Sequence, residues 1–306
     1  MSKFKITWHG PAQTEATVII GIFDGVHKGH QRIISKALEQ NRPVVALTFD
    51  PHPMSIVAPE RKPTQLLTVH DRINQLLLHG VASVAVIDFT KDFAAMSPDD
   101  FINEVLVAEL AASSIVIGSN FTFGAKAAGN AEYLKKTKLF PVTSLDLESE
   151  LGAAVSSSRI RTAIVGGNIE IAKELLTRPH QIVGPVIHGE KRGRAIGYPT
   201  ANIGLSSDTT IPSDGVYAGW LTVGAHRWPA AISIGTNPTF EGLRGRQVEA
   251  YALDEKDLDL YDQIAKVEFG WRLRDTIKFS GLDPLLAQMK EDCDKARELT
   301  RYHAGN

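Results

Sequence analysis

The order of apolar and helical segments changes near residue 180, and this change constrains the fold more than any other feature. Before it, short apolar runs alternate with segments in which apolar residues recur at helical spacing. Buried parallel strands have continuous apolar sequences, and a helix usually connects one such strand to the next. The first part therefore predicts an α/β domain with a doubly wound, Rossmann-like sheet. The expected strands are 17–22, 44–49, 83–87 and 114–118, and the expected helices are 31–39, 69–79, 98–110 and 131–138.

Two shorter helices are expected just before the change, at residues 159–165 and 169–176. The serines at 156–158 offer N-caps to the first helix, and the glycines at 166 and 167 separate it from the second. Pro179 disfavours helical backbone at the residue before it and ends the pair. We therefore place a domain boundary near residue 180, which gives domains 1–180 and 181–306.

After residue 180, strand-like segments follow one another, separated by turns rich in Gly, Pro and Asn. Several short strands at this spacing predict a small antiparallel β-barrel. A helix expected at 284–301 carries apolar residues on one face and would close the barrel. The expected strands are 182–188, 216–223, 228–234, 247–253 and 264–273.

Composition limits the classes of function. A net charge of −2 gives no electrostatic reason to expect a nucleic-acid or membrane-surface partner. The single cysteine, Cys293, excludes an intrachain disulfide and an all-cysteine metal site. No run approaches the roughly 18 to 20 apolar residues of a membrane span, and no signal-peptide pattern follows the N-terminus, so we expect a cytoplasmic protein. The oligomeric state is left open.

The segment Gly21–His30 joins an apolar strand to a helix through a glycine-rich turn. Such a turn places free backbone N–H groups and the positive end of a helix at the carboxyl edge of a sheet, where phosphates bind. His27 and His30 can both face a phosphate from the first helical turn. Taken alone, they are equally compatible with ordinary surface positions, whereas a zinc site is less favoured because no further ligands stand at suitable spacing.

The same segment resembles the HxGH signature of the nucleotidylyltransferase superfamily, in the form carried by prokaryotic bifunctional riboflavin kinase/FMN adenylyltransferases, or FAD synthetases. Residues 48–53, 118–124 and 156–161 resemble further blocks of this family, in the same order. Asn120, Thr122 and Ala127 depart from the Asp and Arg residues of many relatives, which changes the expected detail of the flavin site rather than the reaction class.

The resemblance implies roles for residues of the N-terminal domain. His27, His30 and Arg161 would act in catalysis, with Ser157 and Arg161 holding the phosphates that leave as pyrophosphate. The implied nucleotide-binding residues are Gly21, Phe23, Asp24, Gly25, Ser157 and Ser158, and the implied flavin-binding residues are Pro51, His52, Pro53 and Asn120. The Pro-His-Pro sequence is also compatible with simple turn chemistry.

A second candidate phosphate site occupies residues 189–202, where glycines and cations precede Thr200 and Asn202. These two residues are two apart in an extended segment, so their side chains point to the same side. Their oxygen atoms are the hard ligands that Mg²⁺ prefers, although a turn closed by a Thr/Asn hydrogen bond is the structural alternative.

This second segment is similar to the riboflavin kinase signature, as are 215–218, 233–240 and 248–251. The resemblance implies that Thr200 and Asn202 hold Mg²⁺ and that Glu249 is the catalytic base, although Glu249 also fits a solvated face of a strand. Arg274 would border the flavin or serve the structure. The implied nucleotide-binding residues are Gly189, Lys191, Gly193, Gly197 and Pro199.

The resemblance as a whole implies an Mg²⁺-dependent enzyme that phosphorylates riboflavin to FMN and adenylylates FMN to FAD, with ATP as co-substrate in both steps. Two alternatives are a kinase whose N-terminal domain has lost its activity and a flavin sensor without catalysis. The small-molecule partners are riboflavin, FMN and ATP.

Overall fold

The computed structural model describes residues 4–189, 193, 196–236, 246–255 and 258–301. The chain forms two compact units, of which the first comprises Met1–Pro63 and Leu67–Ser157. The second comprises Thr64–Leu66 and Ser158–Asn306. By packing, the two helices before residue 180 therefore belong with the barrel. The domain boundary near residue 180, which the change in sequence pattern predicts, stays a prediction.

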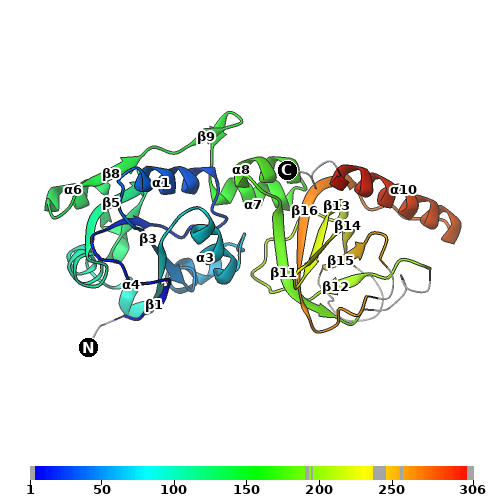
Figure 1. Cartoon of the computed structure of the whole chain (residues 1–306), viewed down its shortest axis with the longest axis horizontal. Helices are drawn as coiled ribbons and strands as arrows, with labels where there is room; N and C mark the ends of the chain where they lie inside the picture. The colour runs from blue at the N-terminus through cyan, green and yellow to red at the C-terminus, as the bar shows by residue number, and fades with distance from the viewer. Residues whose placement is uncertain (1–3, 190–192, 194–195, 237–245, 256–257, 302–306) are drawn as a thin grey trace. The chain divides into compact units, whose positions relative to one another are not determined.

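The first unit is built on a six-stranded sheet, of which β1, β3, β5 and β8 are labelled in Figure 1. The order of its strands is β1-β4-β3-β2-β5-β8. Strand β1 runs antiparallel to β4, and the remaining neighbours are parallel. The strands are β1 (Ile6–His9), β2 (Ala16–Ile20), β3 (Val44–Asp50), β4 (Ser83–Asp88), β5 (Ala112–Gly118) and β8 (Val142–Leu145). Because β3 and β5 lie on opposite sides of β2, the order of the strands reverses there, and ligands of open α/β sheets bind at such a point.

Successive strand residues face two separate cores, as the alternation of a pleated strand requires. Val18 and Leu47 belong to the core under a helix of π geometry, whereas Ile19 and Ala46 belong to the core under α1 and α3. The helices of this unit, including short 3₁₀ segments, are α1 (Lys28–Leu38), α2 (Met54–Val57), η1 (Pro59–Arg61), α3 (Val69–Leu78), α4 (Lys91–Ala94), α5 (Pro98–Asp100), the π-helix η2 (Phe101–Glu109), η3 (Ala125–Ala127) and α6 (Ala131–Thr137).

Two small hairpins complete the first unit, β6 (Thr122–Phe123) with β7 (Gly129–Asn130) and β9 (Ser149–Glu150) with β10 (Ala153–Ala154). Lys28 and Arg32 of α1 form ion pairs with Glu150 and Glu148 of the second hairpin. These pairs attach the β9–β10 hairpin to the helix that follows the glycine-rich turn.

The second unit is a closed antiparallel barrel with the order β11-β12-β15-β14-β13-β16. It closes because β11 pairs with β12 on one side and with β16 on the other. The strands are β11 (His180–Ile187), β12 (Ala201–Ile203), β13 (Gly215–Val223), β14 (His226–Gly235), β15 (Gln247–Ala252) and β16 (Ile264–Arg274). The predicted fold class, a Rossmann-like α/β domain followed by a small antiparallel barrel, is confirmed.

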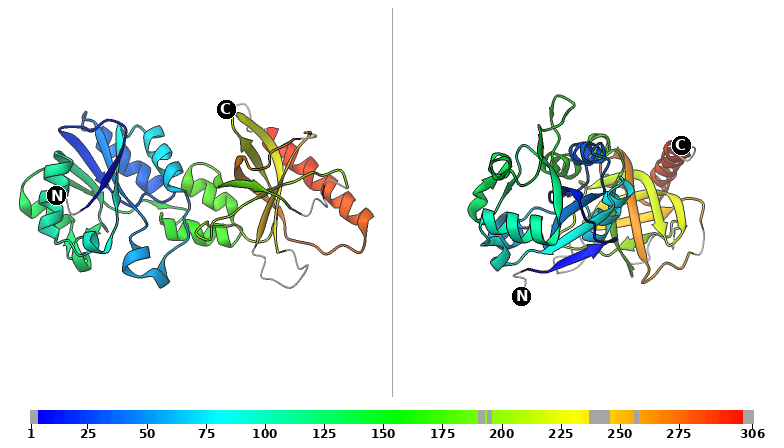
Figure 2. Two further views of the ribbon diagram at one scale, coloured as in Figure 1. Left: turned by 90° about the horizontal axis from the view of Figure 1, so that it is seen from below. Right: turned by 60° about the vertical axis from the view of Figure 1, so that its left-hand side comes forward.

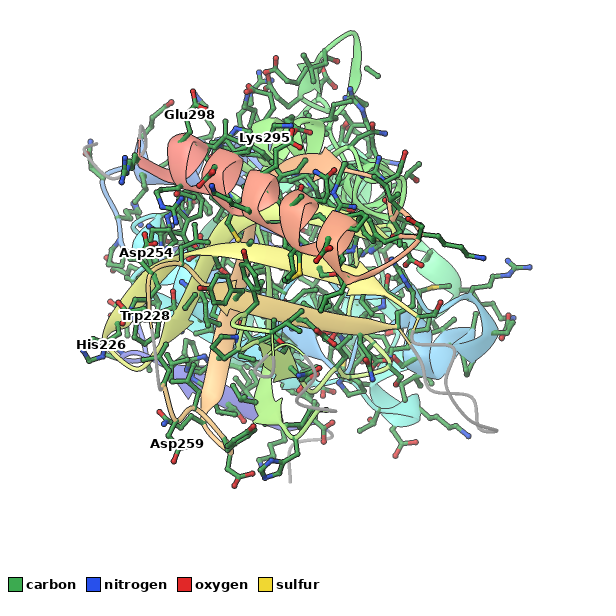
Figure 3. All side chains as sticks on the ribbon, turned by 90° about the vertical axis from the view of Figure 1, so that its right-hand side faces the viewer. His226, Trp228, Asp254, Asp259, Lys295 and Glu298 are labelled. Atoms are coloured by element: carbon green, nitrogen blue, oxygen red, sulfur yellow. The ribbon has the colours of Figure 1, made fainter. Side chains whose placement is uncertain are left out.

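Three helices pack with the barrel: α7 (Ser157–Val165), α8 (Ile169–Leu176) and α10 (Leu282–Arg301). Helix α10 lies along β13, β14 and β16, where Cys293 and Ala296 are buried against Ala218 (Figure 2). Lys295 and Glu298 are exposed on α10 (Figure 3). The expected helix therefore covers the barrel with its apolar face.

A short segment from the first half of the chain also belongs to the second unit. Gln65 forms a parallel bridge with Thr209, and the hydroxyl groups of Thr64 and Thr210 lie 2.8 Å apart.

Among the described residues, no helix is long and apolar enough to cross a membrane.

Candidate active sites

The glycine-rich turn connects the end of β2 to the start of α1 in an unusual backbone conformation. Phe23, Gly25 and Val26 have positive φ angles of 54°, 87° and 41°. Only glycine adopts this region without steric cost, so the turn needs support from its surroundings. The Ser157 hydroxyl donates to the Asp24 carbonyl at 2.9 Å, and the Leu67 amide donates to Asp24 Oδ1 at 3.2 Å.

The two histidines lie together at the start of α1. His27 is the N-cap, and its Nδ1 accepts from the His30 amide at 3.4 Å. Their rings are stacked with centroids 3.7 Å apart. Burial of the ring holds the pKa of His30 well below its usual value, and the neighbouring His27 and Arg72 lower this pKa further. His30 is therefore neutral near pH 7, and a neutral imidazole offers one N–H donor.

The other residues predicted for the flavin lie at the ends of β3 and β5. His52 is buried, and its Nδ1 accepts from the Met54 amide at 3.1 Å, whereas Pro51 is exposed and Pro53 is half-buried. Asn120 is exposed just after β5. Both turns therefore lie at the carboxyl ends of parallel strands within the first unit.

Ser158 and Arg161 belong to α7 and to the second unit. Arg161 is half-buried, and its Nε donates to the carbonyl of Thr64. Ser157, by contrast, belongs to the first unit with Asp24. Packing thus divides the predicted phosphate-binding serines and arginine between the two units.

The second site is a pocket at one side of the barrel. Asn202 and Glu249 are direct partners in the β12–β15 ladder, so their side chains point to the same face. The Thr200 hydroxyl donates to Glu249 Oε2 at 3.3 Å. The pocket is lined by Val186, Gly189, Gly193, Pro199, Thr200, Ala201, Asn202, Leu221, Ala250, Ala252, Glu255, Leu258, Leu260 and Tyr261.

Glycine is required at two pocket positions by close contacts. A Cβ atom at Gly189 would lie 2.3 Å from Asn202 Nδ2, and one at Gly193 would lie 2.3 Å from the Tyr198 carbonyl oxygen. Gly197 has a φ of 89°, which also favours glycine. Of the remaining predicted nucleotide-binding residues, Pro199 lines the pocket and Lys191 lies outside the described residues.

The donors around Thr200 fit a hard cation. A hydroxyl, an amide oxygen and a carboxylate come from Thr200, Asn202 and Glu249, and Mg²⁺ prefers such oxygen ligands while keeping substrate phosphates and waters in its shell. Among the described residues, no cluster of three His, Cys, Asp or Glu side chains could hold a metal ion.

Arg274 forms an extensive ion pair with Asp292 of α10. Its Nη2 lies 2.6 Å from Asp292 Oδ2, and its Nε lies 3.0 Å from both carboxylate oxygens. This contact attaches α10 to the end of β16. The role of Arg274 toward the flavin stays a prediction.

Sequence reasoning missed two features of the sites. Arg72 lies on the buried face of α3, where its pattern was that of an ordinary amphipathic helix. Tyr261 lines the barrel pocket and packs against His188 with ring centroids 4.0 Å apart. In the sequence, Tyr261 stands between two expected strands, outside the segments to which a role was assigned.

The chain matches two family models, described as FAD synthetase over residues 10–159 and as riboflavin kinase over residues 176–300. The Escherichia coli K12 bifunctional riboflavin kinase/FMN adenylyltransferase is 35% identical over 94% of this chain and 93% of its own length. The Listeria monocytogenes protein of the same name is 37% identical over 89% of this chain and 88% of its own length. The Bacillus subtilis protein of the same name is 34% identical over 93% of this chain and 92% of its own length.

A solved structure, described as a macrolide-efflux protein from Streptococcus pneumoniae, is similar in fold with a TM-score of 0.84. It is 33% identical and covers 93% of this chain and 95% of that chain. The resemblance seen in the sequence motifs is confirmed by the family models and the curated relatives. The chain belongs to the family of bifunctional riboflavin kinase/FMN adenylyltransferases.

Proposed function

We propose which residues of this chain perform the two reactions of its family. The protein phosphorylates riboflavin to FMN and adenylylates FMN to FAD, with ATP as co-substrate in both steps. We assign adenylyl transfer to residues 1–180 and phosphorylation to residues 181–306. Because both reactions consume ATP, a cytoplasmic location fits the protein.

In the barrel, Glu249 is the catalytic base. Its carboxylate accepts the proton of the riboflavin 5′-hydroxyl while that oxygen attacks the γ-phosphorus of ATP, and ADP leaves. Asn202 and Thr200 hold Mg²⁺, which neutralises phosphate charge when bound. The glycines at 189, 193 and 197, with Pro199 and Lys191, form the nucleotide-binding segment. The observation that carries this assignment is the hydrogen bond of Thr200 to Glu249, together with the pairing of Asn202 and Glu249 across β12 and β15, next to the pocket that Thr200 and Asn202 line.

In adenylyl transfer, a phosphate oxygen of FMN attacks the α-phosphorus of ATP, and pyrophosphate leaves. His27 and the neutral His30 donate hydrogen bonds to the phosphates and stabilise the charge that develops. Ser157, Ser158 and Arg161 hold the leaving β- and γ-phosphates. The turn residues Gly21, Phe23, Asp24 and Gly25 shape the nucleotide site, and Asn120 with Pro51, His52 and Pro53 borders the flavin.

A reciprocal pair of substitutions tests these assignments. Glu249→Ala removes the base, and we expect FMN formation to fall by on the order of 10²-fold or more while FAD production from supplied FMN stays near wild type. His30→Ala removes a phosphate donor, and we expect the opposite pattern with a comparable loss. Chromatography of both flavin products over time, with Mg²⁺-ATP, measures the two rates. Loss of both activities in either variant would contradict separate sites.

A further inference from the structure

Arg72 of α3 is a buried cation that contacts two separate turns of the first unit. Only 6% of the surface of Arg72 is exposed to solvent. Nη1 donates to the Ile22 carbonyl at 2.8 Å, and Nη2 donates to the Phe49 carbonyl at 3.0 Å. A single guanidinium group therefore joins two backbone positions 27 residues apart in sequence.

These two carbonyls lie beyond the end of the ladder between β2 and β3. The β2–β3 register ends at Ile20 opposite Leu47, and the Gly21 amide still donates to the Leu47 carbonyl at 3.1 Å. Beyond this point, Ile22 enters the glycine-rich turn and Phe49 directly precedes Asp50–Pro53. The guanidinium thus continues the connection between the two strands after their ladder has ended.

The two turns have different proposed ligands. The turn at 21–27 leads to His27 and His30 and takes the ATP phosphates, whereas the turn at 50–53 borders the flavin. Transfer requires the FMN phosphate oxygen and the α-phosphorus of ATP to be aligned, and a displacement of about 1 Å can cost on the order of 10²-fold in rate. The rate of adenylyl transfer therefore depends on the spacing between these two turns.

We propose that Arg72 is a positioning residue for adenylyl transfer, whose guanidinium fixes the spacing between the phosphate turn and the flavin turn. This inference rests on the function proposed above for the first unit. Arg72 does not contact either substrate in this scheme, and it acts through the carbonyls of Ile22 and Phe49.

The chemistry of the site favours arginine over lysine. A planar guanidinium offers separate nitrogens in a fixed fork, whereas an ammonium group is a single point donor. Burial lowers the pKa of Arg72, while the charges of Asp24 and Asp50 raise it. Both aspartates belong to the turns that Arg72 joins, so their charges compensate the buried cation from either side.

The conformation of the phosphate turn explains why such a support is needed. Phe23 and Val26 have positive φ angles without being glycine, so the backbone of the turn is strained at both residues. The Ile22 carbonyl precedes this strained stretch and also accepts from the Thr48 hydroxyl at 3.1 Å. The Thr48 hydroxyl also joins β3 to the phosphate turn, but through one hydrogen bond from a neutral group. Thr48→Val removes this bond and leaves both contacts of Arg72 in place, which makes it a comparison variant for Arg72.

Arg72→Lys is the decisive variant, with Arg72→Gln as a second, because neither side chain can reproduce the fork. We expect kcat for FAD formation from FMN to fall by on the order of 10²-fold. We expect the KM values for ATP and for FMN in FAD formation, which report on the adenylyl-transfer site alone, to change less than about threefold, since each turn keeps its own groups. Retained KM values also show that the first unit is folded. Thr48→Val should change kcat less than about threefold.

Three results would overturn the inference: a wild-type kcat in Arg72→Lys, a rise in the KM for ATP as large as the loss of turnover, or an equal loss of turnover in Thr48→Val. The riboflavin kinase rate of each preparation serves as an internal control and should not change. His30→Ala is assayed in parallel. If that variant keeps full adenylyl transfer, the proposed function fails; if it is inactive and Arg72→Lys is normal, only the role of Arg72 fails.

Discussion

His180, the first residue of β11, is a buried histidine that plays no part in either proposed reaction. Its Nε2 lies 2.9 Å from the Thr210 carbonyl oxygen, and its ring packs parallel to Phe269. Burial lowers the pKa of His180 to about 4. The folded protein therefore keeps this ring neutral at pH values where an unfolded chain would protonate it.

This shift predicts acid sensitivity of the second unit. The unfolded state binds a proton below a pKa of roughly 6.5, so the contribution of His180 is complete above that pH and is lost as the pH falls toward 4. The loss over this window is up to about 3 kcal/mol. Urea unfolding followed by tryptophan fluorescence measures it, because Trp220, Trp228 and Trp271 lie in barrel strands.

His180→Gln should flatten the dependence of the unfolding free energy on pH between 7 and 4.5, since an amide can still donate to the Thr210 carbonyl without titrating. His226, an exposed histidine of the same barrel that packs on Trp228 (Figure 3), is the matched control. His226→Gln should leave the slope unchanged. An equal slope in the wild type and His180→Gln would refute the assignment.

Among the elements, α10 illustrates how a helix is attached to a barrel by more than its apolar face. Asp292 is 6% exposed and receives the Arg274 guanidinium, whereas Asp294, two residues further on, is 58% exposed and pairs with Arg297. Removing one partner of a buried pair leaves an uncompensated charge, but exposed pairs contribute little. The two aspartates therefore contribute differently to the free energy of unfolding, although each pairs with an arginine.

We expect Asp292→Ala to lower the free energy of unfolding of the second unit by about 3 kcal/mol. Asp294→Ala should lower it by less than about 1 kcal/mol. Urea denaturation monitored by tryptophan fluorescence compares the two variants. Similar destabilisation by both would mean that the Arg274–Asp292 pair does not anchor the helix.

The success of sequence reasoning also varied from element to element. Helix α8 (Ile169–Leu176) lies at its predicted residues, because its apolar spacing is regular and a glycine pair precedes it. Strand β1 (Ile6–His9) was missed because it is an antiparallel edge strand outside the strand–helix alternation. Strand β12 (Ala201–Ile203) was missed because three residues in a Gly/Pro-rich segment show no periodicity.

The sites follow the same logic. The positions of His27, Thr200 and Glu249 could be anticipated because each belongs to a local motif. The link from Arg72 to Ile22 and Phe49 could not, because it depends on the packing of α3 across two strand ends and leaves no trace in local spacing. Motifs thus point to the candidate groups, and tertiary packing decides which residues hold those groups in place.

For the whole molecule, the proposed scheme gives the two reactions separate sets of residues, each with its own ATP. His30→Ala retains the kinase groups, and Glu249→Ala retains the histidines of the first unit. An equimolar mixture of the two variants should therefore convert riboflavin to FAD, with FMN made by one protein and used by the other.

Chromatography should show a lag in FAD formation, because FMN must first accumulate in solution. The His30→Ala/Glu249→Ala double variant is the control and should give neither product. If the mixture makes FMN but no FAD, although Glu249→Ala alone adenylylates added FMN, then soluble FMN is not an adequate intermediate.

The short stretch 64–66 has a practical consequence for preparing the second unit as a separate fragment. Gln65 forms a bridge with Thr209, and the hydroxyl groups of Thr64 and Thr210 are in contact. The second unit therefore includes three residues that lie far before the barrel in the sequence. A C-terminal fragment starting at residue 158 would leave these neighbours behind. Such a fragment would expose backbone that is covered in the intact chain, so supplying a 64–66 peptide or grafting that tripeptide onto the fragment should restore lost stability.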